Sequence, residues 1–283
     1  MSSLRQMASF IRWQLVPMRY LTMIRDLRWN QLFQEGPSKS SICEDIEDLG
    51  VSPAQLLNQD QLDEINSIYQ PRIEHVVKKS HGHPFVNLFT GDDITPSNPV
   101  FNLAFSKEVL DVAADYFGNK LILDSMQVLY SYSTDGEVRE SQKWHLDYGD
   151  NKTFHAVVYL NDVLNADDGP FIYADKHASK KLGRPLIMNR IPDLIPKSLE
   201  KHEVHEFLGN AGAMVYVDPA ACYHYGSRCK KSRMAIFITF STWFPYAKPV
   251  PLIIENREKI FSTARKVRPD LSKKFLRTLL QLA

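Results

Sequence analysis

The feature that most constrains the fold is a change in apolar spacing at Lys120. Upstream of it, apolar residues recur at helical intervals. From there to about Phe244 they alternate in short runs separated by turns that contain glycine, proline or asparagine. Alternation with a period of two is typical of strands that bury one face. Eight or so short strands at this spacing predict a β-sandwich or a small barrel, and a barrel mouth is a natural place for a binding site.

The longest of these runs presents Gln127 on one side and Tyr130 on the other, as expected for side chains that alternate across a strand. The strands that we expect most clearly cover residues 121–132, 142–147, 153–160, 171–173, 213–217, 222–225 and 234–243.

A candidate metal site begins in the sequence Trp144-His145-Leu146-Asp147. Side chains two positions apart on a strand point to the same side, so His145 and Asp147 can converge on one point. A further ligand is needed, and His224, which lies between two strand-like runs, is the candidate. Two imidazoles and one carboxylate form the open face that iron(II) prefers. Because a single His-x-Asp also arises by chance among nine histidines, the prediction depends on the ordered set of three.

Two other groupings have metal-ligand chemistry. Cys222, His224 and Cys229 contain zinc-type donors, but no second closely spaced pair completes a structural zinc site. The segment His81-Gly82-His83-Pro84 has two histidines, yet no nearby carboxylate or cysteine. For this segment we expect a loop over a pocket instead of a second metal pair.

Length and composition fit one large domain with helical additions. The chain has 283 residues, 44% of them hydrophobic, and a net charge of +1, so the overall charge does not favour a nucleic-acid partner. Three cysteines without a secretory segment fit a reducing, cytoplasmic setting. No apolar run approaches the ~18 residues of a membrane span. We expect helical support over residues 1–119, a β core over 120–245 and helices over 246–283.

The N-terminal segment 2–25 has no acidic residue before Arg25, and Arg5, Arg12 and Arg19 recur every seven positions. The pattern predicts a basic amphipathic helix with a kink near Pro17. Three interpretations stay open: a helix on the outside of the core, a peripheral membrane contact, and a mitochondrial-type transit segment.

Outside the β core, Ser52 is expected to cap a helix that begins at Pro53, and Gly118 to end another. The helices expected there cover residues 52–69, 105–118, 254–267 and 271–282, with a loop containing one short turn over 36–50.

Several motifs in the β region together resemble those of the phytanoyl-CoA dioxygenase-like branch of the iron(II)/2-oxoglutarate oxygenases. They are Trp-His-x-Asp at 144–147, the Asn-Asp turn with a later glycine at 161–169, Gly-Asn-Ala-Gly at 209–212, Tyr-His-Tyr-Gly-Ser at 223–227, and Arg233. The resemblance covers about residues 120–245. It implies a mainly β fold with flanking helices, in which a double-stranded β-helix is the catalytic core.

The resemblance also implies roles for single residues. His145, Asp147 and His224 would bind Fe(II), and Arg233 would bind the distal carboxylate of 2-oxoglutarate, which a planar guanidinium grips through paired hydrogen bonds. Gln127 would contact co-substrate or substrate, the alternative being a satisfied buried amide. Because related halogenases lack the carboxylate, its presence favours hydroxylation with O2 as the second co-substrate. No catalytic group beyond the iron ligands is expected.

The substrate-binding candidates are less constrained. Tyr130 is one of several tyrosines that can line an apolar pocket or belong to the core. Arg228, with Lys230 and Lys231, forms either an ordinary solvated face or a basic rim for an anionic substrate. His177 follows Gly169 in a loop that departs from the family pattern, so it is either a rim residue or a structural one.

Two other function classes remain open at this point. One is a non-catalytic β-helix that serves as a binding or scaffold module, and the other is a cupin-type metal enzyme that uses no 2-oxoglutarate. Arg233 distinguishes a 2-oxoglutarate oxygenase from the second class, because an enzyme that uses no 2-oxoglutarate needs no carboxylate-binding group there. The substrate is expected to be a small molecule whose class stays open, as does the oligomeric state.

Overall fold

A computed structural model describes residues 40–78, 83–133, 137–183, 190–245 and 247–282. Its strands are β1 (Gln55–Leu56), β2 (Phe85–Asn87), β3 (Leu121–Ser131), β4 (Thr153–Tyr159), β5 (Phe171–Tyr173), β6 (His205–Phe207), β7 (Ala213–Val217), β8 (His224–Gly226) and β9 (Arg233–Thr242). Its helices are α3 (Ser41–Leu49), α4 (Gln59–Tyr69), α5 (Pro99–Ala104), the π-helix η3 (Lys107–Asp111), α6 (Val112–Tyr116), α7 (Lys176–Leu182), α8 (Pro251–Glu255), α9 (Arg257–Val267) and α10 (Lys273–Leu279). Short 3-10 helices cover Pro71–His75, Gly91–Asp93, Glu140–Gln142, Ala166–Asp168 and Lys201–Glu203.

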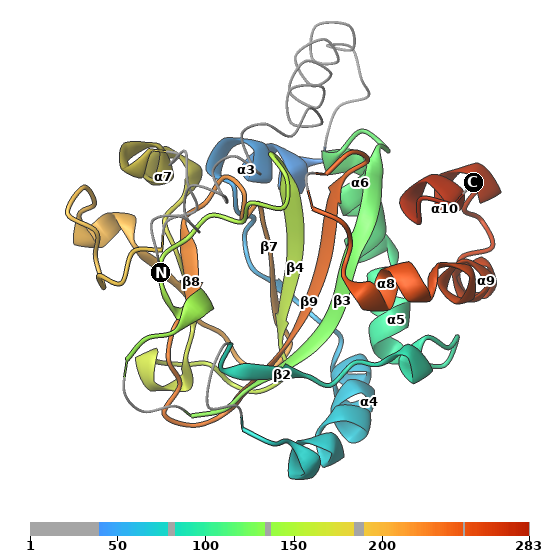
Figure 1. Cartoon of the computed structure of the whole chain (residues 1–283), viewed down its shortest axis with the longest axis horizontal. Helices are drawn as coiled ribbons and strands as arrows, with labels where there is room; N and C mark the ends of the chain where they lie inside the picture. The colour runs from blue at the N-terminus through green and yellow to red at the C-terminus, as the bar shows by residue number, and fades with distance from the viewer. Residues whose placement is uncertain (1–39, 79–82, 134–136, 184–189, 246, 283) are drawn as a thin grey trace, which may run out of the picture.

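Six strands form an antiparallel sheet in the order β1-β7-β4-β9-β3-β2, whose central strands run through the middle of the molecule (Figure 1). Strand β9 lies between β3 and β4 and pairs with both along nearly its whole length. The pairing is continuous except for a register shift between Leu123 and Ser125. Residues far apart in sequence are therefore fixed side by side across three long strands.

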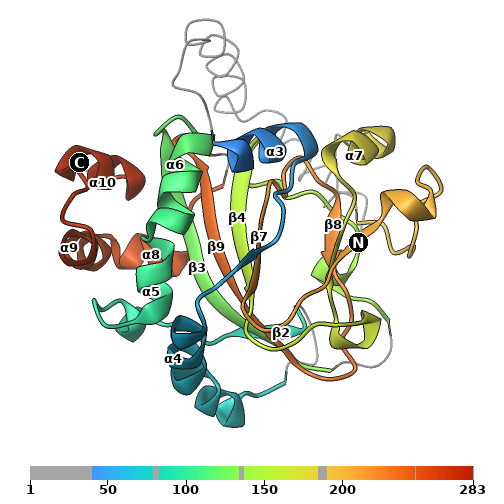
Figure 2. The same cartoon turned by 180° about the vertical axis from the view of Figure 1, so that it is seen from behind.

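One face of this sheet packs against helices. Side chains such as Val128, Ala156 and Ile238 join residues of α4, α5 and α6 in the largest buried apolar cluster. These helices cover the face of the sheet that is turned toward the viewer in Figure 2. Because side chains alternate across a strand, the neighbouring residues on each strand point to the opposite face, away from the helices.

A second, smaller antiparallel sheet has the order β6-β5-β8. Two isolated bridges extend it beyond β8: His145 pairs with His224, and Trp144 pairs with Ile191. A separate apolar cluster, which includes Val157 and Phe171, joins this sheet to the inward face of the larger one. The mainly β architecture with flanking helices is as expected from the sequence. The division of the chain into support, core and C-terminal helices stays a prediction.

Three local expectations were wrong. Residues 142–147 form no regular strand, because this segment is held by single bridges to distant segments. The expected helix at Ser52 begins only at Gln59, capped by Asn58, because residues 55–56 pair with β7 instead. The expected loop over 36–50 contains the helix α3, which is capped by Ser40 and buries Cys43 and Ile46.

Other boundaries moved less. The expected helix 105–118 is a π-turn followed by α6, and Gly118 adopts a left-handed conformation just beyond its end. The basic helix expected at 2–25, with its membrane and transit alternatives, lies outside the described residues. In the described part of the chain, no helix has both the length and the apolar character needed to cross a membrane.

Candidate metal centre

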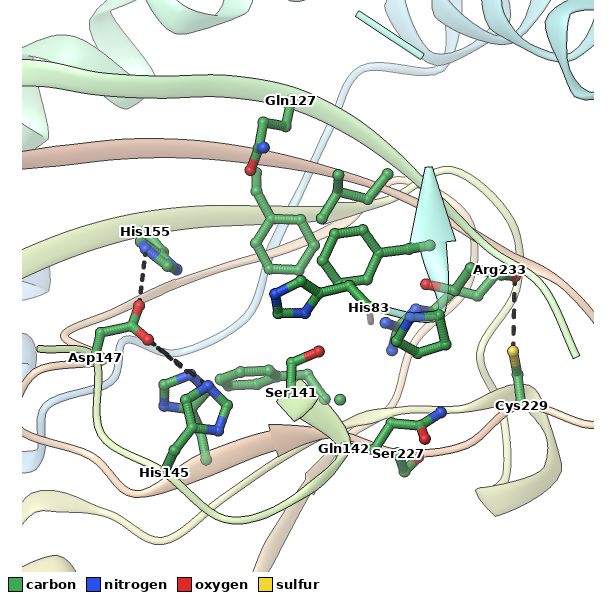
Figure 3. Close-up of a pocket in the computed structure, with 18 of the residues that line it drawn as sticks. His83, Gln127, Ser141, Gln142, His145, Asp147, His155, Ser227, Cys229 and Arg233 are labelled. Atoms are coloured by element: carbon green, nitrogen blue, oxygen red, sulfur yellow. Dashed lines mark hydrogen bonds and ion pairs between the residues drawn. The ribbon is translucent and has the colours of Figure 1, made fainter. Parts of the chain in front are cut away.

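A cavity of about 270 Å³ lies between the inward face of β3 and β9 and the segment that carries His145 (Figure 3). Its walls combine aromatic side chains, including Phe85, Phe171 and Phe237, with convergent polar groups. This volume lies just below the range for small-molecule sites, which usually measure about 300–1,000 Å³.

The three ligands expected from the sequence meet at one side of this cavity. The Nε2 atom of His145 lies 3.7 Å from Oδ1 of Asp147, and that of His224 lies 3.8 Å from the same oxygen. One potential donor atom from each of the three residues lies within 4.8 Å of the other two. This is the spacing of donors around a shared cation, whereas atoms in direct hydrogen bonds lie closer together.

Backbone contacts fix the orientation of both imidazoles. Nδ1 of His145 lies 2.7 Å from the carbonyl of Lys143, and Nδ1 of His224 lies 3.0 Å from that of Cys222. A carbonyl only accepts, so each Nδ1 must carry the proton and donate it. In the neutral form of an imidazole with this tautomer, Nε2 keeps a lone pair, and both Nε2 atoms lie near Asp147, as expected for metal ligands.

The segment that carries His145 and Asp147 is anchored along its length, although it is no regular strand. The amide of Asp147 donates to the carbonyl of Pro219 at 2.8 Å. The buried indole of Trp144 donates to the carbonyl of Leu194 at 3.2 Å. These contacts hold the side chains of the candidate ligands in place, which lowers the cost of ordering the site on binding.

Burial and neighbouring charges set the protonation of the ligands. Burial, reinforced by His224, lowers the pKa of His145 to about 3. Burial by itself raises the pKa of Asp147, but the imidazoles of His224, His155 and His145 outweigh it, and this pKa lies below its ordinary value. At neutral pH the site therefore presents a neutral imidazole and a carboxylate, and a cation need not displace a proton from either.

His155 is a site residue that the sequence analysis missed. It projects from β4 into the cavity, and its Nε2 lies 3.5 Å from Oδ2 of Asp147, the oxygen that faces away from His145 (Figure 3). The alternation of β4 was a usable signal. Side chains alternate along the strand expected at 153–160, so the apolar Phe154, Ala156 and Val158 share one face and His155 lies on the other.

Burial lowers the pKa of His155 to about 4, against the opposing charge of Asp147. In the unfolded chain an ordinary histidine has a pKa of about 6.5. The unfolded state therefore binds more protons as the pH falls below about 6.5, and the folded state is destabilised until the pH reaches about 4. For the metal-free protein we expect this group to cost about 2 kcal/mol between about pH 7.5 and about pH 5.

The variant His155→Gln removes the titration and keeps an amide near Asp147. Its urea-unfolding midpoint in chelator-treated protein should fall less over this pH range than that of the wild type. The matched variant His202→Gln, which changes an exposed imidazole, should follow the wild type. Equal acid sensitivity of His155→Gln and the wild type would contradict the assignment.

Arg233 lies at the start of β9, buried, on the wall of the same cavity. Its Nη1 donates to the carbonyl of Gly169. Its Nε is buried without a hydrogen-bond partner, and no carboxylate pairs with it among the described residues. A buried cation without an anion is costly, so this guanidinium is suited to an anionic ligand that enters the cavity.

Gln127 and part of the histidine-containing segment 81–84, both singled out from the sequence, also line the cavity. Gln127 projects into it from β3, as shown in Figure 3, and His83 and Pro84 line it next to β2. The structure thus brings this part of the expected loop to the pocket. His81 lies outside the described residues.

The three substrate-binding candidates do not line the cavity. Tyr130 packs on the main apolar cluster, on the opposite side of β3 from Gln127. His177 belongs to α7, with its Nε2 3.3 Å from Asp48. Arg228 lies between two lining residues without contributing to the wall itself. Their substrate roles stay predictions.

Lys230 and Lys231, for which a solvated face and a basic rim were the two alternatives, both form ion pairs. The Nζ atom of Lys230 lies 2.9 Å from Asp167, and that of Lys231 lies 3.7 Å from Asp168. Both lysine side chains are exposed, so these pairs favour the solvated-face interpretation.

No model of a known protein family matches this sequence, and no curated protein is significantly similar to it. Solved structures are similar in fold. EctD from S. alaskensis, solved with 2-oxoglutarate and 5-hydroxyectoine, is 14% identical, with 77% of this chain and 83% of that chain covered and a TM-score of 0.54.

Two enzymes of nogalamycin biosynthesis are also similar. The non-heme, alpha-ketoglutarate-dependent carbocyclase SnoK is 14% identical, with 76% of this chain and 91% of that chain covered and a TM-score of 0.53. The epimerase SnoN, solved with Fe3+, alpha-ketoglutarate and nogalamycin RO, is 13% identical, with 74% and 86% covered and a TM-score of 0.50. The chain therefore has the double-stranded β-helix fold that these 2-oxoglutarate-binding enzymes share.

Proposed function

We propose that the protein is an iron(II)- and 2-oxoglutarate-dependent oxygenase of the phytanoyl-CoA dioxygenase-like type, which hydroxylates a small molecule and releases succinate and CO2. The observation that carries the proposal is one cavity with two complementary binding groups. His145, Asp147 and His224 present donors for a cation, and the buried guanidinium of Arg233 lacks an anionic partner among the described residues.

The residues fit both groups in their chemistry. Two imidazoles and a carboxylate suit Fe(II) and leave coordination positions for other ligands. Arg233 suits the distal carboxylate of 2-oxoglutarate, and Gln127 lines the same cavity. Bound iron and 2-oxoglutarate would supply the oxidising power from O2. The protein itself would hold the co-substrate, exclude water and position the C–H bond that reacts.

The oxidative outcome depends on that positioning. SnoK and SnoN are named a carbocyclase and an epimerase, so one fold supports several outcomes. We propose hydroxylation because Asp147 provides the carboxylate that related halogenases lack.

Anaerobic titration with Fe(II) and 2-oxoglutarate tests the proposal. We expect a weak visible charge-transfer band from the iron chelate in wild type, and none in His145→Ala, because one imidazole donor is lost. The matched variant His202→Ala, which changes an exposed histidine, should keep the band. Folded, iron-loaded wild type without a band would favour a scaffold or another cupin-type enzyme, and succinate release under O2 would follow as the activity assay.

A further inference from the structure

Arg190 places a second guanidinium at the cavity, close to the candidate metal ligands. It lines the cavity wall, and its neighbour Ile191 exchanges backbone hydrogen bonds of 2.9 and 3.0 Å with Trp144. The bridge is antiparallel, so Arg190 lies opposite His145, and the two side chains share one face of the local pair.

The guanidinium of Arg190 is only partly used by the protein. Nη2 lies 3.7 Å from Oε2 of Glu140, whose side chain is 49% exposed. Nη1 is buried and has no hydrogen-bond partner among the described residues. Leaving a buried donor without an acceptor is unfavourable, and more so when the donor is charged. The arrangement is therefore suited to an acceptor that comes from a ligand.

The charges of the cavity leave one cation without a role. In the proposed function, Asp147 faces the metal and Arg233 takes the distal carboxylate of 2-oxoglutarate. Arg190 is then the remaining permanently charged group among the described lining residues, next to the metal side of the cavity. A cavity of about 270 Å³ that also holds 2-oxoglutarate favours a small second ligand.

We propose that Arg190 binds a carboxylate of the primary substrate, which makes the substrate a small carboxylic acid. This inference rests on the proposed function of the same site. A planar guanidinium matches a carboxylate better than it matches a neutral amide, because both carboxylate oxygens accept hydrogen bonds and carry the charge. With the acid group held beside His145, the carbon chain of the substrate extends along the aromatic wall that includes Phe171.

The test uses Mn(II) in place of iron, together with saturating 2-oxoglutarate, so that Arg233 is occupied and no reaction takes place. The probes are the straight-chain acids from acetate to hexanoate and their neutral amides. Proton relaxation by Mn(II) reports probes that bind near the metal. We expect enhancement for at least one acid in the wild type and little for its amide.

In Arg190→Gln, the dissociation constant of that acid should rise about tenfold or more, as for loss of a hydrogen bond to a charged group. The dissociation constant for Arg190→Lys should lie between these two values, because lysine keeps the charge but lacks the paired planar donors of a guanidinium. Glu140→Gln, which frees Nη2, should bind the acid at least as well as wild type does. Unchanged affinities for Mn(II) and 2-oxoglutarate would show that each variant is folded and loaded.

Four results would overturn the inference: no acid bound by the loaded wild type, equal binding of acid and amide, unchanged affinity for the acid in Arg190→Gln, or weaker 2-oxoglutarate binding in Arg190→Gln. The last would place Arg190 on the co-substrate instead of the substrate. Failure of the wild type to bind Mn(II) and 2-oxoglutarate at all would count against the proposed function itself, so the two failures are distinguishable.

Discussion

Replacing Arg233 by alanine is expected to raise the dissociation constant for 2-oxoglutarate by about a hundredfold and to leave Fe(II) affinity unchanged. The guanidinium is buried, so its hydrogen bonds to a carboxylate would be made away from competing water. Each bond to a charged partner contributes about 1.5–3 kcal/mol. Two such bonds account for at least a hundredfold in affinity. Anaerobic calorimetry of the iron-loaded variant measures both constants.

The fold should survive this change, because no carboxylate among the described residues pairs with Arg233. Its loss leaves only the carbonyl of Gly169 without that donor. Arg233→Lys is the matched variant. It keeps the charge but loses the paired planar donors of the guanidinium, so its affinity for 2-oxoglutarate should lie between those of the wild type and Arg233→Ala. An equal loss of iron affinity in Arg233→Ala would show a structural role instead of a co-substrate clamp.

The long strands could be predicted from sequence because each buries a helix-facing side and an inward side. In β3 the alternation correctly placed Gln127 and Tyr130 on opposite faces, and the ends of β4 and β7 were correct within a residue. The two faces of such a strand can be recognised from the alternation of its side chains alone. Their pairing order, with β9 between β3 and β4, depends on contacts that no local pattern contains.

The local errors have physical causes in long-range contacts. Ser52 and Pro53 are good helix-starting residues, but Ser52 instead donates its amide to Tyr216 and accepts the Tyr216 amide on its hydroxyl. Pairing with β7 thus overrode local propensity. In α3, only Cys43 and Ile46 are buried, so its acidic, polar sequence resembles a loop.

The candidate site likewise contains residues that the sequence pattern predicts and residues that it does not predict. His145, Asp147 and His224 could be proposed because two share a strand-like spacing and the third follows a recognisable order. Arg190 could not, because it reaches the cavity through one bridge between Ile191 and Trp144. A single cross-strand contact leaves no periodic signal, so residues that hold a substrate are harder to identify than those that hold a metal.

Replacing Asp147 by alanine is expected to lower Fe(II) affinity by more than about a hundredfold. This loss exceeds the usual effect, about 10–100-fold, of replacing a residue that only hydrogen-bonds to a metal ligand. Asp147 would supply the anionic donor, and its Oδ1 is the atom toward which His145 and His224 both direct Nε2. Without it, only two imidazoles remain as ligands, and neither carries a negative charge to offset that of the dication. Anaerobic competition with a chromophoric chelator gives the affinity.

The loss should be chemical and not structural, because the side chain of Asp147 is 32% exposed to the cavity and its backbone amide still bonds to Pro219. Asp48→Ala, which removes a more exposed carboxylate, is the matched control and should bind iron as wild type does. Chloride should restore part of the affinity of Asp147→Ala, because a halide can occupy the position that the carboxylate vacates. Wild-type iron affinity in Asp147→Ala would remove the carboxylate from the ligand set, and with it the argument for an iron site built on two imidazoles and one acid.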